Sequence, residues 1–209
     1  MKPYLMAALA LFCTPLLAGA DVLSGNSDAL GFPVIVDADE PQEGPLVIGG
    51  CELKPEASCP GADLRHADLR GQKLNGIDLS GAKLTRTNFF GAELKGARLV
   101  GADLTGANLE MSQAQGIDLR GATLIGANLA YSRLAGADFS ESNLTGATLE
   151  AAAAHKGKFV GATIVGANLM EAKFYNADFA DAVLEGNFAP YAIWEGVHMD
   201  NCTGCPFNW

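Results

Sequence analysis

The residues best suited to chemistry lie near the end of the chain, where two residues separate Cys202 from Cys205 and His198 precedes them. Two cysteines at this spacing suit a redox pair, and with the histidine they could supply three ligands to a metal ion. A redox pair usually has a helix behind it that lowers the thiol pKa, and Pro206 to Trp209 is too short to form one. We therefore expect a structural disulfide, with redox and metal-binding roles as the alternatives.

No other group of residues resembles a catalytic centre. The three histidines, His66, His155 and His198, lie far apart along the chain. There is no phosphate-binding glycine loop, no nucleophile elbow and no HExxH zinc motif. We therefore predict a protein that is not an enzyme, with no catalytic residues and no cofactor or metal.

A five-residue phrase dominates the chain and must position any functional side chain. It reads Ala, Asp or Asn, Leu or Phe, a variable residue and then usually Gly, as in residues 102–106. Every fifth residue from Leu64 to Leu184 belongs to the central column, which is Leu, Phe or Ile except at Ala114 and Ala154. Each phrase thus supplies two apolar columns, the central one and the mostly alanine column two residues before it.

The period of five excludes a long helix. It fits neither the 3.6-residue turn of an α-helix nor the two-residue alternation of a long strand. Recurring glycines would also cost roughly 1 kcal/mol each against alanine in a helix interior. Short extended runs joined by glycine turns remain, and successive coils must stack to bury the Leu and Ala columns.

The A(D/N)LxG phrase resembles the repeat of the pentapeptide-repeat family, and the resemblance extends over about 28 phrases, residues 62–201. It implies an all-β fold, a right-handed quadrilateral β-helix with four phrases to a coil and about seven coils. It does not imply one function, because this scaffold serves many roles. The best-known role in the family is protection of DNA gyrase by solenoids that resemble duplex DNA in shape and negative charge.

Residues 1–20 have the layout of a secretory signal peptide, with an early Lys2, an apolar stretch and small residues at 18–20. The apolar stretch is shorter than the ~20 residues that a membrane span requires. We expect the mature protein to begin at Asp21, without a membrane span, in the periplasm or outside the cell. An uncleaved membrane anchor is the alternative.

An acidic, proline-rich leader and N-terminal cap occupies residues 21–60, with eight acidic residues and one lysine for a net charge of −7. The repeat region, 61–201, and a C-terminal cap, 202–209, together carry 16 acidic and 12 basic residues, a net charge of −4. The leader's composition cannot bury enough apolar surface to fold alone, so we expect an extended linker. Residues 46–48 (Leu-Val-Ile) are expected to cover the open edge of the first coil.

Four cysteines remain after signal cleavage: Cys51, Cys59, Cys202 and Cys205. An even number in an exported chain is typical of disulfides, and three pairings are formally available. In the solenoid that the resemblance implies, coils about 4.8 Å apart separate the two ends by some 30 Å. Since a bridge needs Cα atoms within about 7 Å, we expect Cys51 to pair with Cys59 and Cys202 with Cys205, so that each bridge pins one end.

Sorting the phrases by fours assigns them to the four faces of the implied coil. Phe139, Phe159 and Phe179 are twenty residues apart and fall on one face, so we expect their rings to stack as a core ladder. On a second face, an outward column is expected to form a ladder of amides along the coils: Asp68, Asn88, Asn108, Asn128, Thr148 and Asn168.

Large side chains beside that amide column form a candidate protein-contact face. They replace Gly, Thr or charged residues at five positions: Phe90, Met111, Tyr131, Met170 and Tyr191. A row of exposed apolar side chains indicates a contact surface for a protein partner, although scattered surface hydrophobics are the alternative.

The neighbouring face carries a mild basic stripe that includes Lys73, Lys95, Arg133 and Lys173. Nucleic-acid-binding domains are usually more basic and interleave aromatic residues, so we predict a solvated face and no nucleic-acid partner. DNA mimicry requires a phosphate-like field that this mixed surface lacks, and an exported protein would not meet gyrase.

A second contact surface is predicted at the C-terminal end, from Phe188, Tyr191, Trp194, Phe207 and Trp209. We expect these aromatics to cap the last coil, and an apolar plate left exposed there would support an end-to-end homodimer. The sequence as a whole predicts a non-catalytic exported solenoid that binds or scaffolds an unknown protein partner. A rigid structural component of the envelope without a tight partner is the alternative.

Overall fold

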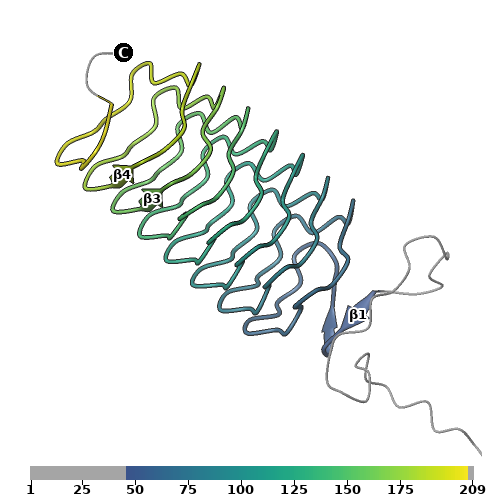
Figure 1. Ribbon diagram of the computed structural model, residues 1–209. Helices are drawn as coiled ribbons and strands as arrows, with labels where there is room; N and C mark the ends of the chain where they lie inside the picture. Colours follow the sequence, from purple (N-terminus) through teal and green to yellow (C-terminus); the bar gives the residue numbers. More distant parts are fainter. Residues whose placement is uncertain (1–45, 207–209) are drawn as a thin grey trace, which may run out of the picture.

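The computed structural model describes residues 46–206, which form a solenoid of stacked coils (Figure 1). Parallel bridges join residues twenty apart, from Ser58 with Asp78 to Val183 with Thr203, so four phrases make one coil. The coiled backbone therefore begins slightly before the predicted boundary at residue 61. The expected signal peptide, the leader as far as residue 45, and Phe207 and Trp209 lie outside the described residues.

Regular strands are short in this fold. The structure has β1 (Val47–Ile48), β2 (Cys51–Glu52), β3 (Thr163–Val165) and β4 (Val183–Glu185). β1 pairs antiparallel with β2, and β3 pairs parallel with β4. Most other phrases contribute one bridged residue to the stack, because the chain turns after each short extended run. Within the described part of the chain, no helix is long and apolar enough to cross a membrane.

A turn closes each phrase at the position two residues after the centre, here called the corner. In one such turn the amide of Ala107 donates to the carbonyl oxygen of Leu104 at 2.9 Å, and the corner residue Gly106 has a φ of +64°. Every corner from residue 56 to residue 201 has a positive φ. Glycine adopts this left-handed conformation without the Cβ clash that other residues incur, which explains why it recurs in the phrase.

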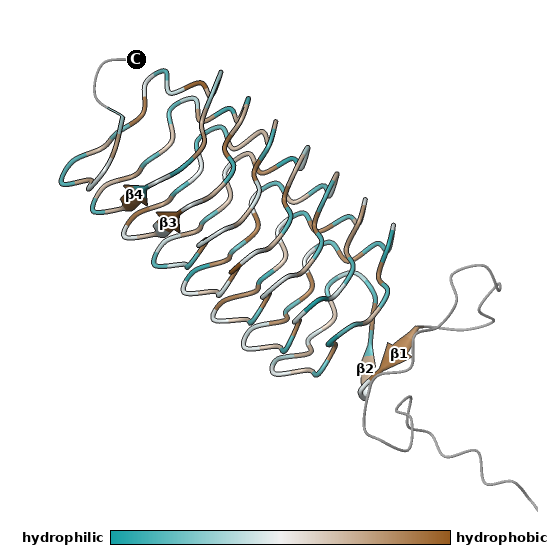
Figure 2. Ribbon diagram, in the orientation of Figure 1, coloured by the Kyte–Doolittle hydropathy of each residue, from teal (hydrophilic) through white to brown (hydrophobic). Residues whose placement is uncertain are grey.

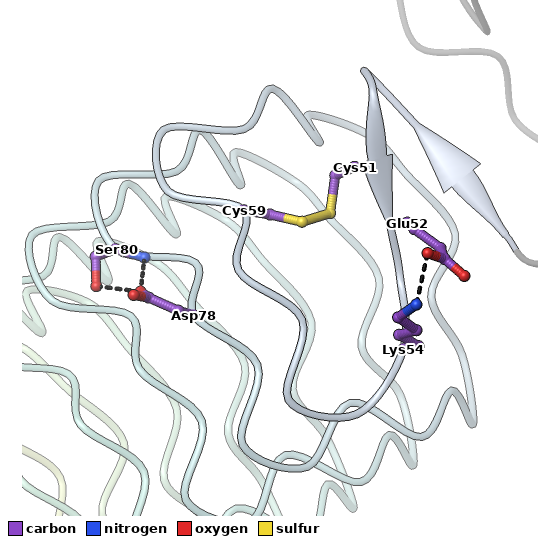
Figure 3. The surroundings of a disulfide bond; sticks show 6 residues. All are labelled: Cys51, Glu52, Lys54, Cys59, Asp78 and Ser80. Carbon is purple, nitrogen blue, oxygen red and sulfur yellow. Dashed lines mark hydrogen bonds and ion pairs between the residues drawn. A yellow bond between two sulfur atoms is a disulfide. The ribbon is translucent and has the colours of Figure 1, made fainter.

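The Asp or Asn before the centre binds the backbone of its own phrase. Asp78 Oδ1 accepts hydrogen bonds from the amide of Ser80 at 3.0 Å and from its hydroxyl at 2.5 Å (Figure 3). Asn143 accepts the amide of Thr145 in the same way, at 3.0 Å. These amides follow the centre and lie outside the backbone ladder between coils, so the carboxylate or amide side chain supplies their acceptor.

The two apolar columns fill the interior, and brown and teal residues alternate along each coil in Figure 2. The rings of Phe139 and Phe159 stack with their centroids 4.9 Å apart, and those of Phe159 and Phe179 at 4.5 Å. Phe174 meets Phe159 and Phe179 edge to face, and Trp194 stacks on Phe174 at 4.7 Å. The aromatic core is thus concentrated in the C-terminal half of the stack.

Both ends of the stack carry a disulfide. Near β1 and β2, Cys51 bonds to Cys59 with the Cα atoms 5.7 Å apart (Figure 3), and Ile48 is buried against the first coil. At the opposite end Cys202 bonds to Cys205, also with a Cα separation of 5.7 Å, and Cys205 is buried. The backbone edges of the first and last coils are thereby partly covered.

Ion pairs on the outer surface predict how stability depends on pH. Asp118 accepts hydrogen bonds from Arg120 Nε at 2.8 Å and Nη2 at 2.7 Å, and these bonds lower the pKa of the carboxyl group. A lowered pKa in the folded state contributes stability above the unfolded pKa of about 4, and this stability is lost as the pH falls through the folded value.

We predict that Asp118→Asn lowers the free energy of unfolding at pH 7 by less than about 1 kcal/mol, because the pair is partly exposed. The asparagine keeps an acceptor for the backbone amide of Arg120, so the coil is retained. Urea unfolding at pH 7 and pH 2.5 checks this: the difference from the wild type should be smaller at pH 2.5 than at pH 7. An equal difference at both pH values would contradict the prediction.

Candidate protein-contact site

The candidate site lies along the corner between two faces of the coil. The second face is defined by the centres Leu69, Phe89, Leu109, Leu129, Leu149 and Leu169, and the third face by Leu74, Leu94, Ala114, Leu134, Ala154 and Phe174. All these centres point into the core and are buried. The residues beside them point outward, and the corner residues project from the edge between the two faces.

Three of the five predicted contact residues come together on successive coils. Phe90, Met111 and Tyr131 are 39%, 55% and 54% exposed. The amide of Gly91, next to Phe90, donates to Glu110, and the amide of Met111 donates to Ala130, so each member lies one coil beyond the last. We call Phe90, Met111 and Tyr131 the apolar ridge.

The other two predicted residues are separate from the ridge. Ala151 and Glu171 occupy the corner on the two coils after Tyr131. Met170 is half-buried, and Tyr191, 82% exposed, lies towards the C-terminal end with the exposed Phe188. The predicted row of apolar residues is therefore divided into two surfaces.

The corner residues of this edge adopt an unfavourable backbone conformation. Met111 and Tyr131 both have a φ of +57°, and Ala151, Glu171 and Tyr191 continue the run at +51° to +60°. A left-handed conformation costs a residue with a Cβ roughly 1–2 kcal/mol. Glycine occupies most other corners, so five consecutive coils retain a side chain here in spite of this cost.

Asparagines beside the ridge do not form the predicted ladder of amides. Asn108 Nδ2 does donate to Asn88 Oδ1, at 3.3 Å. Asn128 instead donates to Glu110 Oε2 at 3.0 Å, and Asn168 to a second glutamate of this face at 3.2 Å. The prediction of a continuous ladder is wrong, because carboxylates on the neighbouring coil are stronger acceptors than a second amide.

Glutamates surround the exposed tyrosine of the ridge. The hydroxyl group of Tyr131 donates to Glu150 Oε1 at 2.9 Å. This hydrogen bond, followed by the negative charge of Glu150 and of the more distant Glu171 and Glu110, raises the pKa of Tyr131. The phenol is thus held protonated, and its ring is anchored on the second face.

The C-terminal end contains His198, Cys202 and Cys205, the three residues that could ligate a metal ion. His198 Nδ1 lies 2.8 Å from Asp178 Oδ1, and Nε2 lies 3.0 Å from Asp200 Oδ2. The hydrogen bonds to these two carboxylates raise the pKa of His198. Cys202 and Cys205 are bonded to each other. Within residues 46–206, no group of three or more His, Cys, Asp or Glu side chains is arranged so that it could hold a metal ion.

A hollow of about 190 Å³ opens at the same end. Its lining includes Leu169, Leu184, Ala189, Trp194 and Pro206. Ala189 occupies a central position that the preceding coil fills with Leu169, so the shorter side chain accounts for part of the space. Of the aromatic residues predicted to cap this end, Trp194 alone lines the hollow within residues 46–206.

Comparison with known families decides the classification. A family model described as "Pentapeptide repeats" matches residues 62–99, 82–121, 117–152 and 155–186, together more than half of the chain. The chain belongs to the pentapeptide-repeat family. Its fold is accordingly a right-handed quadrilateral β-helix, and members of this family are generally non-catalytic.

Three solved structures are similar to this chain. A trypsin-treated form of QnrB1, described as a plasmid-mediated fluoroquinolone resistance protein, is 20% identical over 71% of this chain and 88% of its own, with a TM-score of 0.61. HetL from the cyanobacterium Nostoc, described as involved in regulating heterocyst differentiation, is 24% identical over 70% and 86%, with a TM-score of 0.41. A thylakoid-lumen protein of Arabidopsis thaliana is 31% identical over 57% and 67%, at 0.25. A search of curated protein sequences gives no significant match.

Two features of this pentapeptide-repeat site were missed from the sequence, the glutamates and the backbone strain. Glu110 and Glu150 occupy a variable position of the phrase, where a charged residue attracts no attention. The strain did leave a signal: at the corner between the second and third faces, five successive coils from Met111 to Tyr191 lack glycine, whereas most other corners are glycine.

We predict that Tyr131→Gly leaves the free energy of unfolding within about 1 kcal/mol of the wild type, because relief of the left-handed strain offsets the loss of the side chain. Thermal and urea unfolding check this. A loss of 3 kcal/mol or more, the size expected for a buried aromatic, would show that Tyr131 is a structural residue.

Gly121→Tyr is the matched reverse change. Gly121 is a corner with a φ of +63°, and no other group lies within 4 Å of a Cβ added there. It should destabilise the protein by about 1–2 kcal/mol through backbone strain alone. No loss of stability at Gly121 would mean that this fold tolerates any residue at its corners.

Proposed function

We propose that this chain is an exported, non-catalytic pentapeptide-repeat solenoid that holds a protein partner on the apolar ridge. The observation that carries the proposal is the ridge itself: Met111 and Tyr131 are more than half exposed and occupy corners with a positive φ. Stability alone would favour glycine at these corners. Aromatic residues and methionine are also the side chains most enriched in protein interfaces.

Export to the periplasm or the cell exterior is supported by two independent features. Residues 1–20 have the pattern of a cleavable signal peptide. The four cysteines outside that segment form two disulfides, which persist in oxidising compartments and are rare in reducing ones. On this proposal the disulfides hold the two ends of the stack in the mature protein.

The alternative is a rigid component of the envelope without a tight partner, which the continuous hydrogen bonding between coils would suit. An end-to-end homodimer would instead use Phe188, Tyr191 and the hollow at the C-terminal end. A role as a DNA mimic that interacts with gyrase is the least favoured alternative, since the basic third face interrupts the negative field such a mimic requires.

The ridge variant Phe90→Ser, Met111→Ser and Tyr131→Ser tests the proposed contact surface. We expect it to lose a cross-linked partner that the wild type captures from an envelope extract, while its unfolding free energy stays within about 2 kcal/mol, because the exposed side chains contribute little to the core. The matched control, Phe188→Ser with Tyr191→Ser, should retain the partner. Retention by the ridge variant and loss by the control would point to the C-terminal end instead.

Intact mass of the protein recovered from its native compartment tests export. We expect a chain beginning at Asp21 whose mass changes on alkylation only after reduction, with four cysteines labelled. A full-length chain with free thiols would contradict export. It would favour a cytoplasmic protein, for which gyrase interaction or metal binding would be the functions to test.

A further inference from the structure

We propose that the partner segment carries lysine or arginine beside apolar residues and lies along the second face against the ridge. This inference rests on the proposed function and adds the chemistry of the partner. It comes from the distribution of charge on the two sides of the ridge, which is opposite in sign.

The second face presents unpaired negative charge next to the ridge. Glu110 and Glu150 lie on alternate coils at its outward positions, and Glu171 occupies the corner beyond. Within residues 46–206 none of these three glutamates is in an ion pair. A partner that lays apolar side chains on the ridge must also approach these charges, and basic residues compensate them most directly.

The two glutamates of this face are held in position before any partner arrives. Glu110 accepts one hydrogen bond from Asn128, and Glu150 accepts one from Asn168 and one from Tyr131. An ionised carboxylate can accept about four hydrogen bonds, so both keep free acceptor sites. Ala130, which points outward between them, is only 6% exposed, so side chains already pack over this part of the face. Such fixed geometry reduces the entropy lost on binding.

The third face, on the other side of the ridge, has the opposite charge. Lys95, Arg133 and Lys173 point outward there, with Glu93 and Glu195 as acidic exceptions. A basic segment is repelled from this side and attracted to the second face, which fixes how the partner lies across the corner. The opposite charges of the two faces thus orient the partner segment, and the ridge provides its apolar contact.

Binding of labelled ten-residue peptides to the full protein tests this inference. The probes alternate Lys with Leu, Glu with Leu, or Lys with Ser. We expect the Lys-Leu peptide to bind tightest, and Glu110→Gln with Glu150→Gln to weaken it about tenfold, equivalent to about 1.4 kcal/mol. Glutamine keeps an acceptor for Asn128 and Asn168. The control, Glu141→Gln with Glu185→Gln, removes the same charge from other faces and should change affinity less than about twofold.

Equal weakening by both glutamine pairs would overturn the inference, because it would indicate attraction to net charge alone. Tighter binding of the Glu-Leu peptide would also overturn it. So would sedimentation showing a dimer that the ridge variant abolishes, since a second copy would then cover the ridge.

If the ridge variant loses the captured partner while the glutamine pair retains it, the proposed function stands and this inference fails. If neither change affects capture, both fail.

Discussion

The backbone hydrogen bonds between successive coils are the interaction on which the rest of this structure depends. The amide of Leu104 donates to Thr123 at 2.7 Å, and the amide of Asp103 donates to Ala82 at 3.0 Å, so each phrase is bonded to the coils on both sides. Because side chains alternate between inside and outside, a shift of one residue would exchange buried and exposed columns. The bonds therefore fix which residues meet along each outer column, including the ridge and its glutamates.

A stack bonded in this way has unpaired backbone groups at its two ends. The first and last coils each lack one neighbour, and an open backbone edge invites pairing with other chains. β1 and β2 cover the first coil and bury Ile48, whereas a hollow lies beside Trp194 of the last coil. The two disulfides restrict local opening where a repeat protein has the fewest contacts.

Much of the fold follows from the sequence, because the five-residue period identifies the apolar columns and the family resemblance implies four phrases to a coil. The five-residue spacing assigned the columns, and the spacing of Phe139, Phe159 and Phe179 indicated which rings would meet. What could not be predicted depends on local competition between side chains. Asn128 is bridged to Asn108 on the neighbouring coil, yet its side-chain amide donates to Glu110 instead. The division of the contact face has another origin, because Ala151 and Glu171 occupy the corner on the two coils between Tyr131 and Tyr191.

The structure also explains why a binding surface would lie at a corner. The outward positions within a face are occupied by side chains that satisfy the backbone, as Asn128 does for Ala130 at 3.0 Å. A corner side chain projects beyond both faces and takes no part in that bonding. Placing Met111 and Tyr131 there costs backbone energy but leaves the interior unchanged. The rigid stack then holds aromatic, thioether and carboxylate groups at a fixed spacing, so a partner would adapt to this surface more than the surface to the partner.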